Sequence, residues 1–131
     1  MNSLEKALKE QIMNCKILNN YRCGVYVKHG GQKAFVMDEL MRILKNDIEV
    51  ERIISASYNK EVRFKNGSIL RIITTDNSAR GHKNHGAIID ENLPIKALRC
   101  IVLPTLIPRW LDETTMEPWE EVEKRIYYCE I

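Results

Sequence analysis

Apolar residues recur along much of the chain at intervals of three and four, the spacing of one face of an α-helix. The first stripe predicts an amphipathic helix over residues 3–18, and a second predicts a helix over residues 32–45. A third helix is expected from about residue 94, ended by Pro104 and Pro108, and a fourth over residues 119–131. The positions in the first stripe are Leu4, Leu8, Ile12 and Cys15.

Between these helices lie short β-branched and aromatic runs that predict strands. The runs cover residues 23–27, 53–57, 61–65, 68–74 and 86–89. Asn66-Gly67 separates two of them and favours a two-residue type I′ hairpin, in which both central residues have positive φ. The last run is apolar throughout, as expected of a strand buried on both faces of a parallel sheet. The pattern indicates one α/β domain over residues 1–131, with a mostly parallel sheet, a β-hairpin and flanking helices.

The composition, with 44% hydrophobic and 29% charged residues, is that of a folded globular protein. No apolar run reaches the ~18 residues that a membrane-spanning helix needs. The first residues, MNSLEKALKEQ, lack the apolar core of a secretion signal. Both features predict an intracellular protein with no membrane partner. The four cysteines are widely spaced without a C-x-x-C pair, so we expect reduced, mostly buried thiols.

The formal net charge of +2 conceals an uneven distribution along the chain. Residues 60–85 hold six basic against two acidic side chains, whereas residues 110–131 hold seven acidic against two basic ones. A basic middle favours a surface that faces a polyanion, and the acidic end predicts a solvated terminal helix over about 110–131. Ordinary surface charge is the alternative interpretation.

The strongest candidate for chemistry is Asp90-Glu91, which directly follows the last apolar run. Ligands of open α/β sheets bind outside the carboxyl ends of the strands. In P-loop nucleotide hydrolases an aspartate at this place holds Mg²⁺, and the following glutamate activates the attacking water. The alternative is structural: the pair closes a strand, and Asn92 caps the next helix.

Three neighbouring motifs extend the pattern. Asn66-Gly67-Ser68 forms a hairpin, Arg80-Gly81 lies in a polar loop before the acidic strand, and Gln32 heads a helix after a strand. Their order, with 23 positions from Ser68 to Glu91, resembles the ATPase domain of phage terminase large subunits, the motors that pump DNA into capsids. The resemblance covers roughly residues 4–104.

This resemblance implies a partial P-loop NTPase sheet, Mg²⁺ on Asp90, and ATP as the nucleotide. It also implies a location in the cytoplasm of a bacterial host. The catalytic residues that it implies are Asp90, Glu91 and Arg80.

Two parts of that family's pattern are missing from the sequence. There is no G-x-x-x-x-G-K-[S/T] phosphate loop, and no nuclease domain. The segment His29–Ala34 lies between a strand and a helix, where a phosphate could bind, but Lys33 follows Gln and precedes Ala. A degenerate phosphate loop and a simple glycine turn are the two interpretations of this segment. We therefore expect the isolated chain to bind ATP and Mg²⁺ poorly and to lack independent ATPase activity.

Basic side chains in the hairpin and the following loop are candidates for contacts to DNA phosphates. Tyr58 and Phe64 offer a stacking surface, although packing in the core is the commoner fate of such aromatics. His82 and His85 have no cysteine nearby, so a zinc site is not expected. The predicted nucleic-acid-binding residues are Lys65, Arg71, Arg80 and Lys83.

Three hypotheses follow for the function. The first is a terminase-like domain that binds double-stranded DNA or another packaging-motor subunit, or that supplies its acids to a site completed by another chain. The second is a small phage or prophage interaction or inhibitor protein that uses the fold as a scaffold, with Trp110, Trp119, Tyr127 and Tyr128 as the binding surface. The third is a fragment of a split motor gene. Self-association is a further alternative for the partner.

Overall fold

The computed structural model of the 131-residue chain describes residues 3–76, 79, 81–106 and 119–131. Helix α1 (Ser3–Ile17), strand β1 (Arg22–Val27) and helix α2 (Gly30–Ile43) come first. Strands β2 (Val50–Ser55), β3 (Lys60–Phe64), β4 (Ile69–Thr74) and β5 (Gly86–Asp90) follow. The chain then forms α3 (Ile95–Ala97), a π-helical turn (Leu98–Val102), α4 (Leu103–Thr105), α5 (Trp119–Glu123) and β6 (Ile126–Cys129).

The strands form one six-stranded sheet in the order β2-β3-β4-β1-β5-β6. Strands β4, β1, β5 and β6 are parallel to one another, and β3 is antiparallel to both β2 and β4. The expected α/β architecture, a mostly parallel sheet with a hairpin between flanking helices, is confirmed. A parallel strand needs a crossover connection, and the helices supply most of these crossovers.

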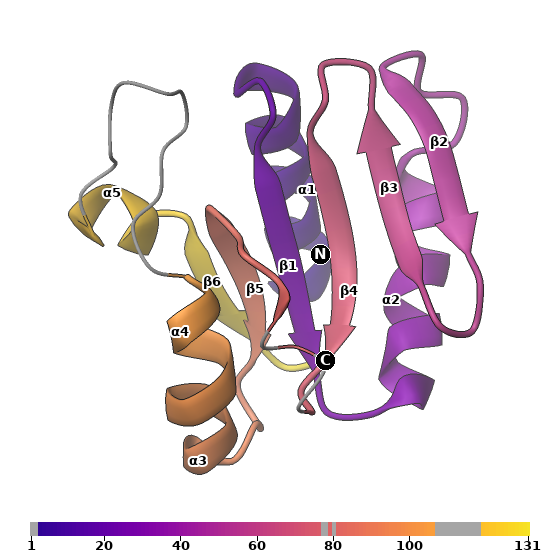
Figure 1. Ribbon diagram of the computed structural model, residues 1–131. Helices are drawn as coiled ribbons and strands as arrows, with labels where there is room; N and C mark the ends of the chain where they lie inside the picture. Colours follow the sequence, from indigo (N-terminus) through magenta and orange to yellow (C-terminus); the bar gives the residue numbers. More distant parts are fainter. Residues whose placement is uncertain (1–2, 77–78, 80, 107–118) are drawn as a thin grey trace.

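Helices cover the two faces of the sheet unequally. Helices α1 and α2 lie behind the sheet in Figure 1, where their apolar stripes pack on Val25, Leu70 and Ile88. The segment from α3 to α4, together with α5, covers the other face over β1, β5 and β6, with Val102 and Val122 packed on Ile89. On that second face no described helix lies over β2 and β3, and β4 is covered only in part, where Ile73 packs in the same cluster as Val102 (Figure 1). We call this uncovered side of the three strands the open face.

The hairpin between β3 and β4 differs from the expected two-residue turn. The Gly67 N–H donates to the Phe64 carbonyl at 3.0 Å, and the Phe64 N–H donates to the Ser68 carbonyl at 2.9 Å. Of the turn residues only Gly67 has positive φ, at 89°, so the predicted type I′ turn is wrong. The loop has three residues and ends in a glycine bulge, the next commonest hairpin connection.

The side chains of two residues in this hairpin, Asn66 and Ser68, bind the end of α1. The Asn66 side-chain amide donates to the Cys15 carbonyl at 2.7 Å, and the Ser68 hydroxyl donates to the Leu18 carbonyl at 2.7 Å. The Ser68 hydroxyl also accepts the Tyr21 N–H at 3.1 Å. The last carbonyls of a helix have no partner within the helix, and these side chains provide one from about 50 positions away.

The C-terminal third contains two further differences. The helix that follows β5 continues past Pro104 to Thr105, and a π-helical turn lies just before the proline. Because proline has no N–H, the ladder is already interrupted there, which suits a wider turn. The predicted helix over about 110–131 is wrong at its end, because Ile126–Cys129 is a strand paired with β5. Residues 107–118 of that prediction lie outside the described residues.

Among the described residues no helix has both the length and the apolar character required to cross a membrane. Cys15, Cys23 and Cys129 are buried free thiols, and Cys100 is an exposed one. Burial raises the pKa of Cys15 to about 12, so that thiol stays protonated and unreactive at neutral pH.

Candidate functional site

Asp90 lies at the carboxyl end of β5, between the parallel strands β1 and β6. The connection after β1 passes over one face of the sheet and the connection after β5 passes over the other, so the strand order reverses between them (Figure 1). This is the position where open α/β sheets bind ligands. The sequence-based placement of the acid at the tip of an interior strand is therefore confirmed.

The Asp90 carboxylate is buried, with 1% exposure, and both of its oxygens accept hydrogen bonds. Oδ2 accepts from the Gln32 side-chain amide at 2.9 Å, and Oδ1 accepts the Asn92 N–H at 3.0 Å. Asn92 thus continues the turn after β5 and does not cap the next helix, whose cap residue is Pro94. Glu91 is exposed, and its N–H donates to the Cys129 carbonyl at 2.9 Å.

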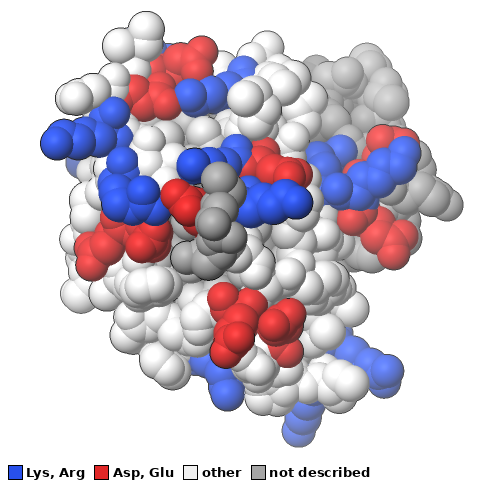
Figure 2. All heavy atoms as spheres, turned by 180° about the vertical axis from the view of Figure 1, so that it is seen from behind, with Lys and Arg blue, Asp and Glu red and all other residues white. Residues whose placement is uncertain are grey.

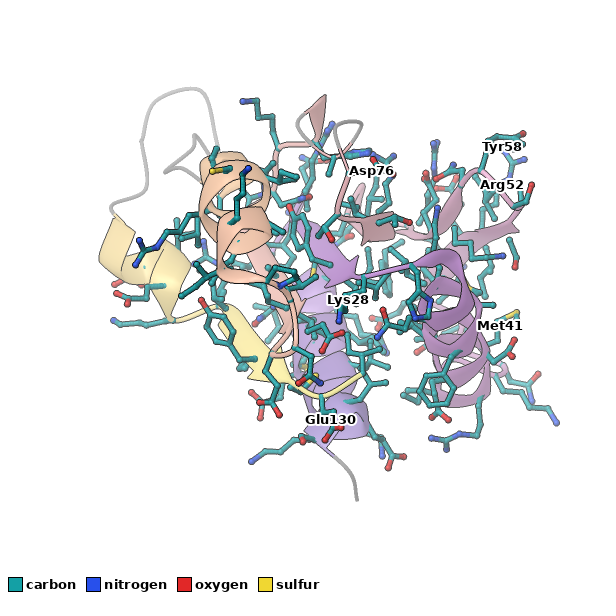
Figure 3. All side chains as sticks on the ribbon, turned by 90° about the horizontal axis from the view of Figure 1, so that it is seen from below. Lys28, Met41, Arg52, Tyr58, Asp76 and Glu130 are labelled. Carbon is teal, nitrogen blue, oxygen red and sulfur yellow. The ribbon has the colours of Figure 1, made fainter. Side chains whose placement is uncertain are left out.

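Gln32 connects Asp90 to the turn between β1 and α2. Its side-chain oxygen accepts the N–H groups of Lys28 at 2.7 Å and His29 at 3.2 Å. Its amide nitrogen donates to Asp90 and also to the Ile131 carbonyl at 3.1 Å. Figure 3 views this end of the sheet, with Lys28 beyond the end of β1. Gln32 was expected to head this helix, but its link to Asp90 could not be read from the sequence, because the two residues are 58 positions apart.

A metal at Asp90 stays a prediction. Within residues 3–76, 79, 81–106 and 119–131, no three His, Cys, Asp or Glu side chains gather in a way that could hold a metal ion. Arg80, expected to complete the catalytic set, lies outside the described residues.

The open face carries a cluster of charged side chains from three strands. Glu61 on β3 is fully buried there, and its carboxylate accepts from Arg63 Nε at 2.5 Å and from Arg71 Nη2 at 2.9 Å. Asn59 donates to the same carboxylate at 2.8 Å. Burial by itself would raise the pKa of Glu61, but the hydrogen bonds from Arg63, Asn59 and Arg71 outweigh it and lower that pKa to about 2.

Arg71 also contacts the loop that precedes β5. Its Nη1 donates to His82 Nδ1 at 3.0 Å, which leaves the proton of a neutral imidazole on Nε2. Burial lowers the pKa of His82, and the positive charges of Arg71 and Lys33 lower it further. His82 is therefore neutral at pH 7 and can donate through Nε2.

Two hollows meet at Arg71 and His82. The smaller, of about 80 Å³, lies toward the amino ends of β1 and β4 and is lined by Arg22, Lys83 and Asn84 as well. The larger, of about 540 Å³, lies toward the carboxyl ends and is lined also by Lys33, Tyr58 and Asp76. Figure 3 shows Arg52, Tyr58 and Asp76 on the side of the sheet opposite α2. Tyr58 is 86% exposed and so can meet a ligand.

The predicted nucleic-acid-binding residues are only partly brought together. Arg71 and Lys83 line the same small hollow, but Lys65 lines a different one near Lys16 and Glu49. Phe64 is 1% exposed in the core and cannot stack on a base. Sequence reasoning missed Arg22 and Arg52. No local pattern marks these two residues, because they reach the open face through the strand register: Arg52 pairs with Arg63 across β2 and β3, and Arg22 pairs with Ile69 across β1 and β4.

The face covered by α1 and α2 has a different charge pattern. Figure 2 shows acidic and basic side chains interspersed over it. Several of them are paired: Arg42 with Glu5 and Glu39, and Lys16 with Asp47 and Glu49. On the open face Glu61 lies between Arg63 and Arg71, and Asp76 lines the larger hollow. Arg22, Arg52 and Lys83 form no ion pair with a described residue.

No protein-family model matches the chain, and neither a curated protein nor a solved structure matches it.

Proposed function

We propose that the chain is a DNA-binding domain with a terminase-like, P-loop-type fold that does not hydrolyse ATP by itself. The observation that carries the proposal is the open face, where basic side chains line two hollows that share Arg71 and His82. Arg52 and Arg63 form a cross-strand pair on β2 and β3 of the same face. Phosphate contacts of this kind supply most of sequence-independent binding to DNA. The exposed Tyr58 adds a ring on which an unpaired base can stack.

The acids at the end of β5 support the second half of the proposal. Asp90 is held by Gln32 and by its own turn, and a buried carboxylate with both oxygens engaged is a poor ligand for hydrated Mg²⁺. The sequence also has no phosphate loop. Losing charge-assisted phosphate contacts, worth about 1.5–3 kcal/mol each, weakens nucleotide affinity by several powers of ten.

Salt dependence tests the DNA-binding half. Fluorescence anisotropy of a labelled 20-base-pair duplex, titrated with the chain at 50 and 200 mM NaCl, should show binding that weakens steeply with salt. Each neutralised phosphate contributes a slope of about −0.9 in log affinity against log salt. The variant Arg52→Gln should bind more weakly and reduce the slope by about one. Lys45→Gln, which removes the same charge from the turn after α2, is the matched control.

A flat response to salt, or equal effects of Arg52→Gln and Lys45→Gln, would contradict DNA binding by the open face. Calorimetry with MgATP tests the other half. We expect no binding at micromolar concentrations of nucleotide, and micromolar affinity would show that Asp90 serves a nucleotide site after all. A chain that binds neither DNA nor nucleotide would favour the scaffold hypothesis, in which the fold only presents a protein-binding surface.

A further inference from the structure

The small hollow beside Arg71 differs from the rest of the open face because hydrogen bonds fix the loop that forms its wall. One wall of the hollow is the loop that precedes β5. Hydrogen bonds to strand β1 and to helix α4 hold that loop in place. The Asn84 side chain donates to Tyr26 Oη at 2.7 Å, and the Asn84 N–H donates to the Thr105 carbonyl at 3.0 Å. The next residue is also bonded to β1, because the His85 N–H donates to the Arg22 carbonyl at 2.8 Å.

Gly24 allows this loop to approach the sheet. A Cβ atom at this position would lie 2.7 Å from the Asn84 side-chain nitrogen, so any larger residue would push the loop outward. The loop and β1 therefore hold the walls of the hollow in place before any ligand arrives. Preformed sites bind their ligands without a large ordering cost.

The charges that face the hollow suit one doubly charged anion. Arg71 shares the Glu61 carboxylate with Arg63, while Arg22 and Lys83 are exposed and form no ion pair with a described residue. Among the described residues that line the hollow there is no carboxylate. The neutral His82 adds an N–H donor through Nε2. Arg71 has five N–H groups, of which three donate to Glu61 and His82, so two remain for a ligand.

The size of the hollow points to a phosphate group. About 80 Å³ holds several waters or one phosphate, and it is too small for a nucleoside. A phosphodiester inside a strand carries a single charge, whereas a terminal phosphate carries close to two at neutral pH, because its second pKa is about 6. Two cations without an ion-pair partner among the described residues, beside one small hollow, match the terminal group better than the internal one.

We propose that the hollow lined by Arg22, Arg71, His82 and Lys83 is a subsite for the terminal phosphate of a DNA strand. The inference rests on the proposed function, since it assumes that the rest of the strand follows the open face. In that arrangement the larger hollow, with Tyr58 at its rim, accommodates the first nucleotides. The subsite adds a preference for strand ends to binding that is otherwise independent of sequence.

Short oligonucleotides test the subsite. Single-stranded DNA hexamers with a 5′-phosphate, a 3′-phosphate or hydroxyls at both ends would be compared by anisotropy at fixed salt. We expect one of the phosphorylated hexamers to bind at least about tenfold more tightly than the unphosphorylated one, the scale of one or two charge-assisted contacts. Inorganic phosphate at millimolar concentration should remove that preference by competing for the hollow. Equal affinity of all three hexamers would overturn the subsite while leaving DNA binding intact.

Two variants locate the effect. Arg22→Gln and Lys83→Gln both replace exposed side chains whose backbone bonds remain, so folding should be preserved. Each should abolish most of the preference for a phosphorylated end and weaken the unphosphorylated hexamer only slightly. Lys45→Gln keeps the preference. A loss of affinity for all hexamers by the same factor in Arg22→Gln would show a diffuse electrostatic surface and overturn the subsite. Loss of all DNA binding by the unaltered chain would instead refute the proposed function itself.

Discussion

The two halves of the sheet are stabilised in different ways. Strands β1 and β5 lie between helices on both faces, and every residue of β5 is buried. Strands β2, β3 and β4 have helices on one face only, and on their open face the fully buried side chain of β3 is a carboxylate, Glu61. In the first half apolar area excludes water, and in the second half two arginines and an asparagine cover a charge. The second arrangement leaves cations at the surface where a ligand can reach them.

The largest expected difference between the halves comes from apolar truncation. Ile88→Ala on β5 should lower the free energy of unfolding by about 3–4 kcal/mol, because it opens a cavity among fully buried neighbours. Ile54→Ala, on the half-buried open face of β2, should cost about 1 kcal/mol. Urea denaturation of both variants measures the two values. Equal losses would mean that the open face is covered after all.

Removal of the buried charge tests the second half directly. Glu61→Gln should destabilise the chain by about 2–3 kcal/mol, less than the ~3–5 kcal/mol of a fully enclosed pair because Arg63 and Arg71 stay partly exposed. The same variant releases two cations and should bind the 20-base-pair duplex more tightly. A variant that is less stable but binds no better would separate the structural role of Glu61 from any control of DNA binding.

Acid should weaken the open half selectively. The pKa of Glu61 is lowered from 4.5 to about 2, so its contribution is complete above pH 4.5 and is lost as the pH falls toward 2. Between pH 6 and pH 3 this one group should account for a loss of about 2 kcal/mol. Urea denaturation at both pH values measures it. Glu61→Gln, which cannot titrate, should lose that much less between the same two pH values.

The smallest expected effect concerns the two acids after β5. Asp90→Ala leaves the partly buried Gln32 amide with one acceptor fewer and should destabilise the chain by about 1–2 kcal/mol. Glu91→Ala changes an exposed side chain and should stay within about 0.5 kcal/mol of the unaltered chain. Thermal denaturation followed by circular dichroism compares them. A destabilising Glu91→Ala, or a neutral Asp90→Ala, would reverse the roles given to the two residues.

The sequence predicted the elements whose periodicity is regular and missed those that depend on distant contacts. The stripe in α1 and the apolar run of β5 give a helix and a buried strand without further information. Residues 126–129 form a strand because the edge of β5 offers backbone hydrogen-bond partners. No local sequence pattern reveals that edge. Aromatic and β-branched residues in that segment suit a strand as well as a helix face.

The candidate sites divide in the same way. Asp90 could be placed at a strand tip because parallel strands put their carboxyl ends at one edge. The ion pair between Arg71 and Glu61, ten positions earlier, could not be foreseen, because it follows from the register between β3 and β4. Arg22 and Lys83 meet only because the loop before β5 folds across β1 at Gly24.

The side chains of Asn66 and Ser68 have a consequence for how the molecule opens. They bind the carbonyls at the end of α1, so the hairpin loop and the last turn of that helix cannot separate without breaking the same bonds. Backbone amides of the two segments should therefore exchange with deuterium at similar rates, as one cooperative unit. The turn between β3 and β4 therefore also connects helix α1 to the sheet, which its local sequence does not show.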